Sequence, residues 1–504
     1  MANPLYDSLF GQHLESEAVF LHLPEEQSLT YGDFLRLAAR YAGAFTDMGL
    51  VAGDRVAVQI EKSPQALAVY AACVQAGLVF LPLNTAYTAD EVTYFVENSG
   101  AGIVLGDDNK CSALEPIAKS CGARLETLNA NGSGSFADKA AGFPTVFDTV
   151  PREAGDLAAF LYTSGTTGRS KGAMLTQDNL LSNAQTLQKE WRFTARDVLL
   201  HALPIFHTHG LFVASNITML SGSSMIFMPK FNLDQIISDM PCATTMMGVP
   251  TFYTRLLSDV RFTKDLANHM RLFVSGSAPL LAETHVQFEE RTGHRILERY
   301  GMTETNMNTS NPYDGERRAG TVGFPLPGIE LKITDSNTGE TLPQGEIGEI
   351  EVRGPNVFGG YWQMPDKTAE ELRSDGFFIT GDLGQIDADG YVSIVGRNKD
   401  LIISGGYNIY PKEIELLLDN QQGVLESAVI GVPHSDFGES VLGVLVARPE
   451  QELDIEGIRQ KIGKSLAQFK QPQKLVVVPE LPRNTMGKVQ KKALREMFSG
   501  ELIS

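Results

Sequence analysis

An apolar run that leads directly into a glycine- and hydroxyl-rich loop constrains the fold of this chain most. Residues 157–162 (LAAFLY) predict a buried strand, and every residue from Thr163 to Gly172 is a glycine, a hydroxyl residue or a basic residue. Glycine lets the backbone of such a loop approach a ligand closely, so that N–H groups can surround phosphate oxygens. Hydroxyl groups add donors and Lys171 adds charge. The sequence therefore predicts a strand followed by a phosphate-binding loop.

This loop differs from a Walker A loop, in which Gly-Lys-Ser/Thr follows four free positions. Here Ser170 precedes Lys171 and Gly172 follows it. The alternative interpretation is a polar surface turn between two strands. If the loop binds phosphate, the residues that we expect to contact it are Thr163, Ser164, Gly165, Thr166, Thr167, Gly168 and Lys171.

Helical and strand patterns alternate along the first part of the chain, which indicates a layered α/β architecture with largely parallel sheets. Helices are predicted at 29–45 and 64–75, strands at 55–60 and 102–105, and the alternation continues over 199–274. Between these parts, residues 131–142 are rich in glycine, serine and alanine. That composition predicts a loop.

The composition changes after about residue 320, where glycine, proline and short strand patterns indicate a β-rich subdomain. A compact α/β pattern returns after Asp400. We therefore expect a mobile boundary at Arg397 to Asp400. The elements predicted on its two sides are strands at 330–333, 348–353, 391–395, 428–432 and 474–478, and helices at 411–418 and 453–466.

Length and charge narrow the class of protein. A chain of 504 residues is too long for one ordinary core, so two or more domains are expected. Asp and Glu outnumber Lys and Arg by 61 to 42, which gives a net charge of −19. Such an acidic surface argues against nucleic acid or anionic membranes as partners. A polyanion such as ATP would need local basic residues and oriented N–H groups.

The cysteines and the N-terminal segment predict a cytoplasmic protein. The four cysteines lack metal-ligand spacing, and the apolar sequence around Cys73 and Cys242 predicts that both are core thiols. The first basic residue other than histidine is Arg36, so neither a signal-peptide nor an Arg-rich transit pattern is present. The most apolar stretch, 66–83, contains polar and helix-breaking residues, and predicts a helix and a strand rather than a membrane span.

Four further motifs occur in a fixed order after the glycine-rich loop. They are Tyr300-Gly-Met-Thr-Glu304, Thr380-Gly-Asp382, Gly396-Arg-Asn-Lys-Asp400 and Pro482-Arg-Asn-Thr-Met-Gly-Lys488. Together with the loop, they resemble the signatures of the AMP-forming acyl-CoA synthetases, of the adenylate-forming superfamily, over nearly the whole chain. The resemblance implies a reaction that joins a carboxylic acid to CoA through an acyl-adenylate, with ATP and Mg²⁺.

The resemblance also implies how the chain is divided into domains. Residues 1–396 would form the large domain that binds ATP and the acid, and residues 397–400 would form a hinge. Residues 401–504 would be a small mobile domain that carries the catalytic lysine. Because one site must serve two reactions, the small domain is expected to rotate about Lys399 and to present two faces in turn.

The family's nucleotide-binding roles transfer to matching positions of this sequence. The loop would hold the β- and γ-phosphates, Glu304 would help to bind Mg²⁺, and Asp382 with Arg397 would bind the ribose. Thr303 is a candidate donor to the α-phosphate. Taken singly, Glu304 could equally be a helix-capping acid, Asp382 a turn residue and Arg397 part of a surface ion pair. The other residues expected at the nucleotide are Ser277, Ala278, Pro279, Tyr300, Gly301 and Met302.

The C-terminal motif implies a catalytic role for Lys488. By resemblance, its ammonium bridges the substrate carboxylate and the α-phosphate, a role that suits a long flexible cation. An exposed essential lysine would also be open to acylation by a lysine acyltransferase, which removes its charge. For the second half-reaction, the resemblance implies that Gly405, Gly406 and Tyr407 line the passage for the CoA arm.

Two arginines suggest the substrate. Arg299 precedes the Tyr300 motif and Arg255 follows a segment that flanks the acyl pocket in this family, where residues tend to be apolar or small in enzymes for fatty or aromatic acids. A guanidinium there favours a second carboxylate on the substrate. His207 lies at the family's acyl-site gate and could face the same carboxylate. The resemblance is to malonyl-CoA synthetases, and it implies malonate and methylmalonate as acids.

Other interpretations stay open at this point. The arginines could form ordinary helix or neighbour ion pairs, and the acid would then be a fatty or aromatic monocarboxylate. A stand-alone adenylation enzyme that loads a carrier protein is a second alternative. A light-emitting or non-catalytic relative is a third, although Glu304, Asp382 and Lys488 are all present.

Overall fold

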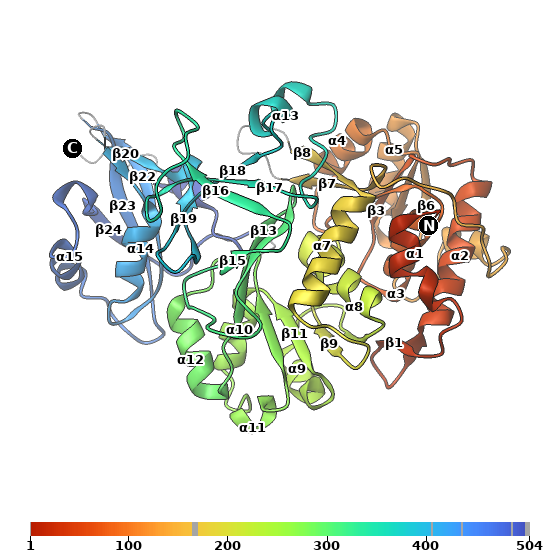
Figure 1. The fold of residues 1–504 in the computed structure, drawn as a ribbon, viewed down its shortest axis with the longest axis horizontal. Helices are drawn as coiled ribbons and strands as arrows, with labels where there is room; N and C mark the ends of the chain where they lie inside the picture. Colours follow the sequence, from red (N-terminus) through yellow and green to blue (C-terminus); the bar gives the residue numbers. More distant parts are fainter. Residues whose placement is uncertain (1, 164–169, 405–406, 435–436, 485–486, 499–504) are drawn as a thin grey trace. The chain divides into compact units, whose positions relative to one another are not determined.

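The computed structural model describes residues 2–163, 170–404, 407–434, 437–484 and 487–498 (Figure 1). By their internal contacts these residues form two compact units. The first contains Met1–Glu330 and Val352–Phe378, and the second contains Leu331–Glu351 and Ile379–Ser504. The division runs through the β-rich segment predicted after residue 320, whose strands lie mainly in the second unit.

The larger sheet of the first unit has nine strands in the order β15-β14-β13-β12-β11-β9-β10-β1-β2. The six strands from β13 to β1 run parallel, and antiparallel pairs close both edges. In sheet order, the bounds are Phe324–Pro325, Asn306–Ser310, Leu297–Met302, Leu272–Ser275, Thr245–Gly248, Val198–His201, Ser224–Phe227, Val19–His22 and Ser28–Thr30.

The second sheet of this unit has six strands in the order β6-β5-β3-β4-β7-β8. Strands β7 and β8 are antiparallel and pair Thr163 with Lys171, so the two ends of the predicted phosphate-binding loop stand side by side. The other neighbours are parallel. In sheet order, the bounds are Arg124–Thr127, Ile103–Gly106, Arg55–Gln59, Val79–Pro82, Leu157–Thr163 and Lys171–Thr176.

Helices connect these strands, and local sequence signals fix several of their starts. Helix α3, for example, begins at Pro64 because the Ser63 hydroxyl accepts the Ala66 N–H and proline suits the first turn. The longer helices of the unit are α2 Tyr31–Asp47, α3 Pro64–Gln75, α4 Ala89–Ser99, α5 Cys111–Cys121, α7 Gln177–Glu190, α10 Pro250–Leu257 and α12 Ala282–Thr292, and the short helix α13 spans Pro365–Glu371.

The second unit contains two smaller sheets. Four strands form the order β16-β17-β18-β19, and a five-stranded sheet has the order β21-β20-β23-β22, with β24 parallel to β23. The strands are Glu330–Thr334, Gly348–Arg353, Phe378–Ile386 and Val392–Arg397 in the first sheet, and Tyr407–Ile409, Ile402–Ser404, Gly438–Ala447, Val424–His434 and Lys474–Val478 in the second; the helices are α14 Pro411–Asp419, α15 Ile455–Gly463 and α16 Lys491–Met497.

The predicted α/β fold is confirmed, with two local corrections. Residues 135–140 of the predicted loop form helix α6 (Ser135–Ala140), whose Phe136 is buried against Tyr41 and Phe45. Tertiary packing of one aromatic ring thus overrides a weak local preference. Cys73 is buried as expected, whereas Cys242 is exposed and is not a core thiol. Among the described residues, no helix is both long and apolar enough to cross a membrane.

Asp419, the last residue of α14, makes a pH-dependent contribution to stability. Burial raises its pKa to about 6, although its carboxylate accepts a hydrogen bond from Ser427 Oγ at 2.7 Å. Because the folded-state pKa lies above the usual 3.8, the stability gained from protonation is present below pH 4 and is lost as the pH rises through 6. At pH 7 the ionised carboxylate costs the fold at most about 2–3 kcal/mol.

We therefore expect Asp419→Asn, which keeps the acceptor oxygen, to raise the thermal unfolding temperature at pH 7.5 but not at pH 4. Differential scanning calorimetry of both proteins at the two pH values measures this. An equal difference at both pH values would show that the ionisation of Asp419 is not the cause.

Candidate active site

The carboxyl ends of neighbouring parallel strands in the large sheet bring several polar residues together. Such ends are where open α/β sheets place ligand sites. His201 ends β9, Gly248 ends β11 and Ser275 ends β12, and Arg299 lies in the adjoining strand β13. His201, Ser275 and Arg299 are all buried.

Arg299 has the most distinctive environment in this group. Its side chain is 4% exposed, and neither Nε nor Nη2 has a hydrogen-bond partner in the described part of the chain. Burial lowers its pKa to about 9. A Cβ atom on Gly276 would lie 2.3 Å from Arg299 Cζ, so the guanidinium lies close against the Gly276 backbone and a side chain there would displace it. A buried guanidinium with two vacant donors is suited to bind an anion.

His209 adds a second buried group with a vacant nitrogen. It begins the π-helix η3 (His209–Ser215), and its Nδ1 lies 3.2 Å from Ser277 Oγ. Its Nε2 has no hydrogen-bond partner among the described residues. Burial, followed by the charge of Arg299, holds the pKa of His209 well below its usual range, so the ring is neutral at pH 7. When the Ser277 hydroxyl donates to Nδ1, Nε2 carries the proton and can donate to a ligand oxygen.

The predicted gate residue His207 lies close to His209 and is half-buried. Its charge would contribute to the lowered pKa of His209. The His-Thr-His-Gly segment led to the prediction of His207 as a site residue, and His209 was not predicted. The π-helical turn that begins at His209 places the His209 imidazole, rather than that of His207, in the buried site with Arg299. This turn cannot be predicted from the sequence.

Lys62 and His201 stabilise the π-helical turn that begins at His209. The ammonium of Lys62 is buried, donates to the His201 carbonyl oxygen at 2.7 Å and lies 2.9 Å from His201 Nδ1. On the other side of the ring, His201 Nε2 lies 2.8 Å from the Gly210 carbonyl oxygen. This chain of contacts fixes the backbone next to His209. Neither Lys62 nor His201 was predicted from the sequence.

Arg255 lies elsewhere. It is exposed on α10, and its guanidinium packs over the ring of Phe231 at 5.4 Å. On the same helix, Tyr253 turns inward and donates from its hydroxyl to the Val274 carbonyl oxygen at 2.6 Å. The structure therefore brings Arg299, His209 and Ser277 together, but does not bring Arg255 into this buried group.

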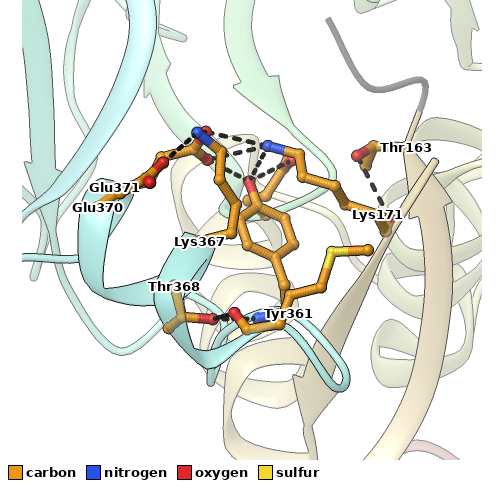
Figure 2. A network of polar contacts seen from close by, with 9 residues as sticks. Thr163, Lys171, Tyr361, Lys367, Thr368, Glu370 and Glu371 are labelled. Carbon is orange, nitrogen blue, oxygen red and sulfur yellow. Dashed lines mark hydrogen bonds and ion pairs between the residues drawn. The ribbon is translucent and has the colours of Figure 1, made fainter. Parts of the chain in front are cut away.

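A second polar cluster joins the residues predicted to bind phosphate and Mg²⁺ (Figure 2). Lys171 Nζ lies 3.0 Å from the Tyr361 hydroxyl and 3.0 Å from both carboxylate oxygens of Glu371. The Tyr361 hydroxyl lies 2.6 Å from Glu371 Oε2 and 3.1 Å from Glu304 Oε1. Tyr361 and Glu371 were not predicted, because no local pattern distinguishes them from other residues of 359–371.

Glu304 is the one predicted metal ligand, and the residue is 4% exposed. Across the described residues, no group of three or more His, Cys, Asp or Glu side chains could hold a metal ion by itself. Mg²⁺ commonly binds through one or two carboxylates together with substrate phosphates. A single buried carboxylate linked through Tyr361 to Lys171 fits that mode of binding.

The remaining predicted nucleotide residues of the first unit lie in two turns. Tyr300, Gly301 and Met302 end β13, and Thr303 begins the turn into β14. A Cβ atom on Gly301 would lie 1.8 Å from the Asn306 carbonyl oxygen, so this hairpin requires glycine there. In the turn after β12, Ser277 has a left-handed φ of 71° and is followed by Ala278 and the exposed Pro279. Such a φ is uncommon for a residue with a side chain, and is found often at ligand sites.

In the second unit, Asp382 and Arg397 face each other across the antiparallel strands β18 and β19. Arg397 Nε lies 2.5 Å from Asp382 Oδ1, and Asp382 is 3% exposed. The predicted hinge residue Lys399 is exposed in a short 3₁₀ turn, Asn398–Asp400, whose Asp400 pairs with Arg495 at 2.7 Å.

Two further predicted residues of the second unit are exposed. The ring of Tyr407 stacks on Phe469 with centroids 4.6 Å apart. Lys488 follows a turn in which Asn484 Oδ1 accepts the Lys488 N–H at 2.9 Å. This contact fixes the backbone at Lys488. The predicted residues Ser164, Gly165, Thr166, Thr167, Gly168, Gly405 and Gly406 lie outside the described residues.

Comparison with known proteins identifies the family. The AMP-binding enzyme family matches residues 10–362, and the AMP-binding enzyme C-terminal domain matches residues 413–488. A malonate–CoA ligase of Arabidopsis thaliana is 34% identical over 91% of this chain and 80% of its own length. A long-chain-fatty-acid–CoA ligase of Bacillus subtilis is 32% identical over 93% of this chain and 90% of its own.

A crystal structure of ATP-bound MatB from Rhodopseudomonas palustris is 55% identical, covers 99% of both chains and superposes with a TM-score of 0.97. The two matched family ranges and these relatives span nearly the whole chain. This chain belongs to the AMP-binding enzyme family and is an acyl-CoA ligase that works through an acyl-adenylate.

Proposed function

We propose that the acid is a short dicarboxylate, malonate, with methylmalonate as a second substrate. The observation that carries the proposal is the buried guanidinium of Arg299 with its vacant Nε and Nη2. Relatives of similar identity are named for malonate and for long-chain fatty acids, so overall likeness does not select the acid. The choice of acid must therefore be inferred from the residues around the acyl site.

The charges around Arg299 favour an anion over an apolar chain. The neighbours that share its buried group are the neutral His209 and the hydroxyl of Ser277, and burial holds the pKa of the nearby His201 well below its usual range, so that ring is neutral too. An unpaired buried guanidinium costs several kcal/mol, which a substrate carboxylate would recover and an alkyl group would not. Arg299 can meet such a carboxylate as a planar fork, while His209 Nε2 adds a donor.

In the proposed reaction, the other carboxylate of the acid attacks the α-phosphorus of ATP and pyrophosphate leaves. The thiol of CoA then attacks the acyl carbon of the adenylate, and AMP leaves. Chemistry of this kind depends on positioning and on neutralising charge. Lys171 would hold the departing phosphates, Asp382 and Arg397 the ribose, Thr303 the α-phosphate and Lys488 the developing charge. Mg²⁺, held by Glu304 and the phosphates, would supply further neutralisation.

The test is AMP release in the presence of ATP, Mg²⁺ and CoA, measured for acetate, propionate, butyrate, malonate, methylmalonate, succinate and a fatty acid. We expect kcat/KM for malonate to exceed that for propionate by at least about 10³-fold, because the site rejects acids that leave its buried polar groups unpaired. Preference for any monocarboxylate would refute the proposed substrate. Activity that needs a carrier protein in place of CoA would indicate an adenylation enzyme.

A further inference from the structure

The phosphate-binding lysine of the proposed site is already paired with a carboxylate of the chain. Lys171 Nζ lies within 3.0 Å of both Glu371 oxygens, and the Lys171 and Glu371 side chains are 15% and 22% exposed. The ammonium also lies over the Tyr361 ring at 4.1 Å. Figure 2 shows the ammonium groups of Lys171 and Lys367 both directed at the Glu371 carboxylate. This carboxylate therefore occupies the donors that a phosphate would use.

Glu371 has a second cation that allows it to release Lys171. Lys367, one turn earlier on α13, lies 3.0 Å from Glu371 Oε1 and 2.8 Å from Glu370 Oε2. A half-buried carboxylate that lost its only cation would be strongly disfavoured. Because Lys367 and the Tyr361 hydroxyl stay in place, Glu371 keeps two partners after Lys171 has moved to a phosphate.

We propose that Glu371 is an internal counter-anion for Lys171 and sets the affinity for ATP and pyrophosphate, which must displace it from the ammonium. This inference rests on the proposed role of Lys171. It concerns the β- and γ-phosphates alone, since these are the groups that Lys171 is expected to hold. Affinity for AMP, which lacks both phosphates, is therefore independent of Glu371.

The experiment measures binding of ATP, inorganic pyrophosphate and AMP by isothermal titration calorimetry. The proteins are the wild-type chain, Glu371→Gln, Lys171→Ala and the double variant. Glu371→Gln removes a negative charge next to the polyphosphate and frees Lys171, so we expect ATP and pyrophosphate to bind about 3- to 10-fold more tightly. AMP should bind as in the wild-type protein. In the Lys171→Ala background, Glu371→Gln should lose most of its effect.

Glu370→Gln is the matched control. Glu370 is the adjacent carboxylate of α13, pairs with Lys367 and does not contact Lys171, so its substitution should leave ATP affinity unchanged. Lys367→Met is the second variant. It leaves Glu371 with Lys171 as its only cation, so ATP should bind several-fold more weakly, and this effect should disappear when Glu371→Gln is added.

The outcomes separate the two proposals. If Lys171→Ala weakens ATP binding but Glu371→Gln does not strengthen it, or strengthens ATP and AMP alike, the counter-anion role is wrong and the phosphate role of Lys171 stands. If Lys171→Ala leaves ATP and pyrophosphate affinity unchanged, both are wrong. If Glu371→Gln fails to fold, Lys367→Met still tests the counter-anion role of Glu371. Weaker ATP binding in Lys367→Met supports that role, and unchanged ATP binding overturns it.

Discussion

Replacing Arg299 with methionine should lower kcat/KM for malonate by about 10²- to 10³-fold, while short monocarboxylates such as propionate are used as well as before or better. Removing one partner of a buried, hydrogen-bonded charge pair costs about 2–5 kcal/mol. Methionine fills a similar volume without charge, so it does not penalise an alkyl group. Steady-state AMP release with both acids measures the change in selectivity, and KM for ATP should stay constant because Arg299 is not expected at the nucleotide.

The same substitution has an expected effect on stability that a general packing defect would not give. Arg299 is buried with vacant donors, so the free protein bears the desolvation cost of its guanidinium. Arg299→Met should therefore keep or raise the thermal unfolding temperature without ligand, and malonate should no longer raise it. A lower unfolding temperature together with equal losses for malonate and propionate would mean that Arg299 is structural.

Arg255→Met is the matched comparison, since it makes the same chemical change at an exposed arginine over Phe231. We expect it to change kcat/KM for malonate less than about threefold, as is usual for exposed positions. A selective loss for malonate in this variant would restore Arg255 to the carboxylate site, as the sequence motif alone suggested.

The α/β fold and most element positions were predictable because they depend on local signals. Helix α3 and strand β24, for example, have the predicted bounds, since a proline at the first turn and a β-branched apolar run mark them. Residues 135–140 were not predictable in this way. Their helix depends on a pocket for Phe136 formed by Tyr41 and Phe45, almost a hundred residues earlier.

For the site, the sequence singled out motif residues but not the side chains that complete their environment. Arg299 was evident from its position beside Tyr300. The space that Gly276 leaves for the Arg299 guanidinium and the pairing of Glu371 with Lys171 cannot be inferred from one sequence. Glu371 is one of 61 acidic residues, and only the three-dimensional approach of α13 to β8 distinguishes it.

Replacing Lys488 with alanine should abolish most formation of the acyl-adenylate and leave the second half-reaction nearly intact. If the ammonium stabilises the charge that develops between the substrate carboxylate and the α-phosphate, its loss should lower the adenylation rate by about 10²- to 10³-fold, as for other single groups of this kind. Thioester formation starts from an adenylate that already exists, so it does not need that contact. Malonate-dependent release of pyrophosphate measures the first step, and formation of malonyl-CoA from added malonyl-adenylate and CoA measures the second.

Lys492→Ala is the control for this variant, because Lys492 is an exposed lysine four residues further along, with a side chain that is 87% exposed. It should leave both half-reactions unchanged, and both variants should unfold at the wild-type temperature, since exposed substitutions change stability by about 0.5 kcal/mol or less. Equal losses in the two half-reactions of Lys488→Ala would contradict a role confined to adenylation. They would indicate instead that Lys488 acts on a group that is present in both steps. The α-phosphate is such a group, because Lys488 is proposed to contact it and the bound adenylate retains it.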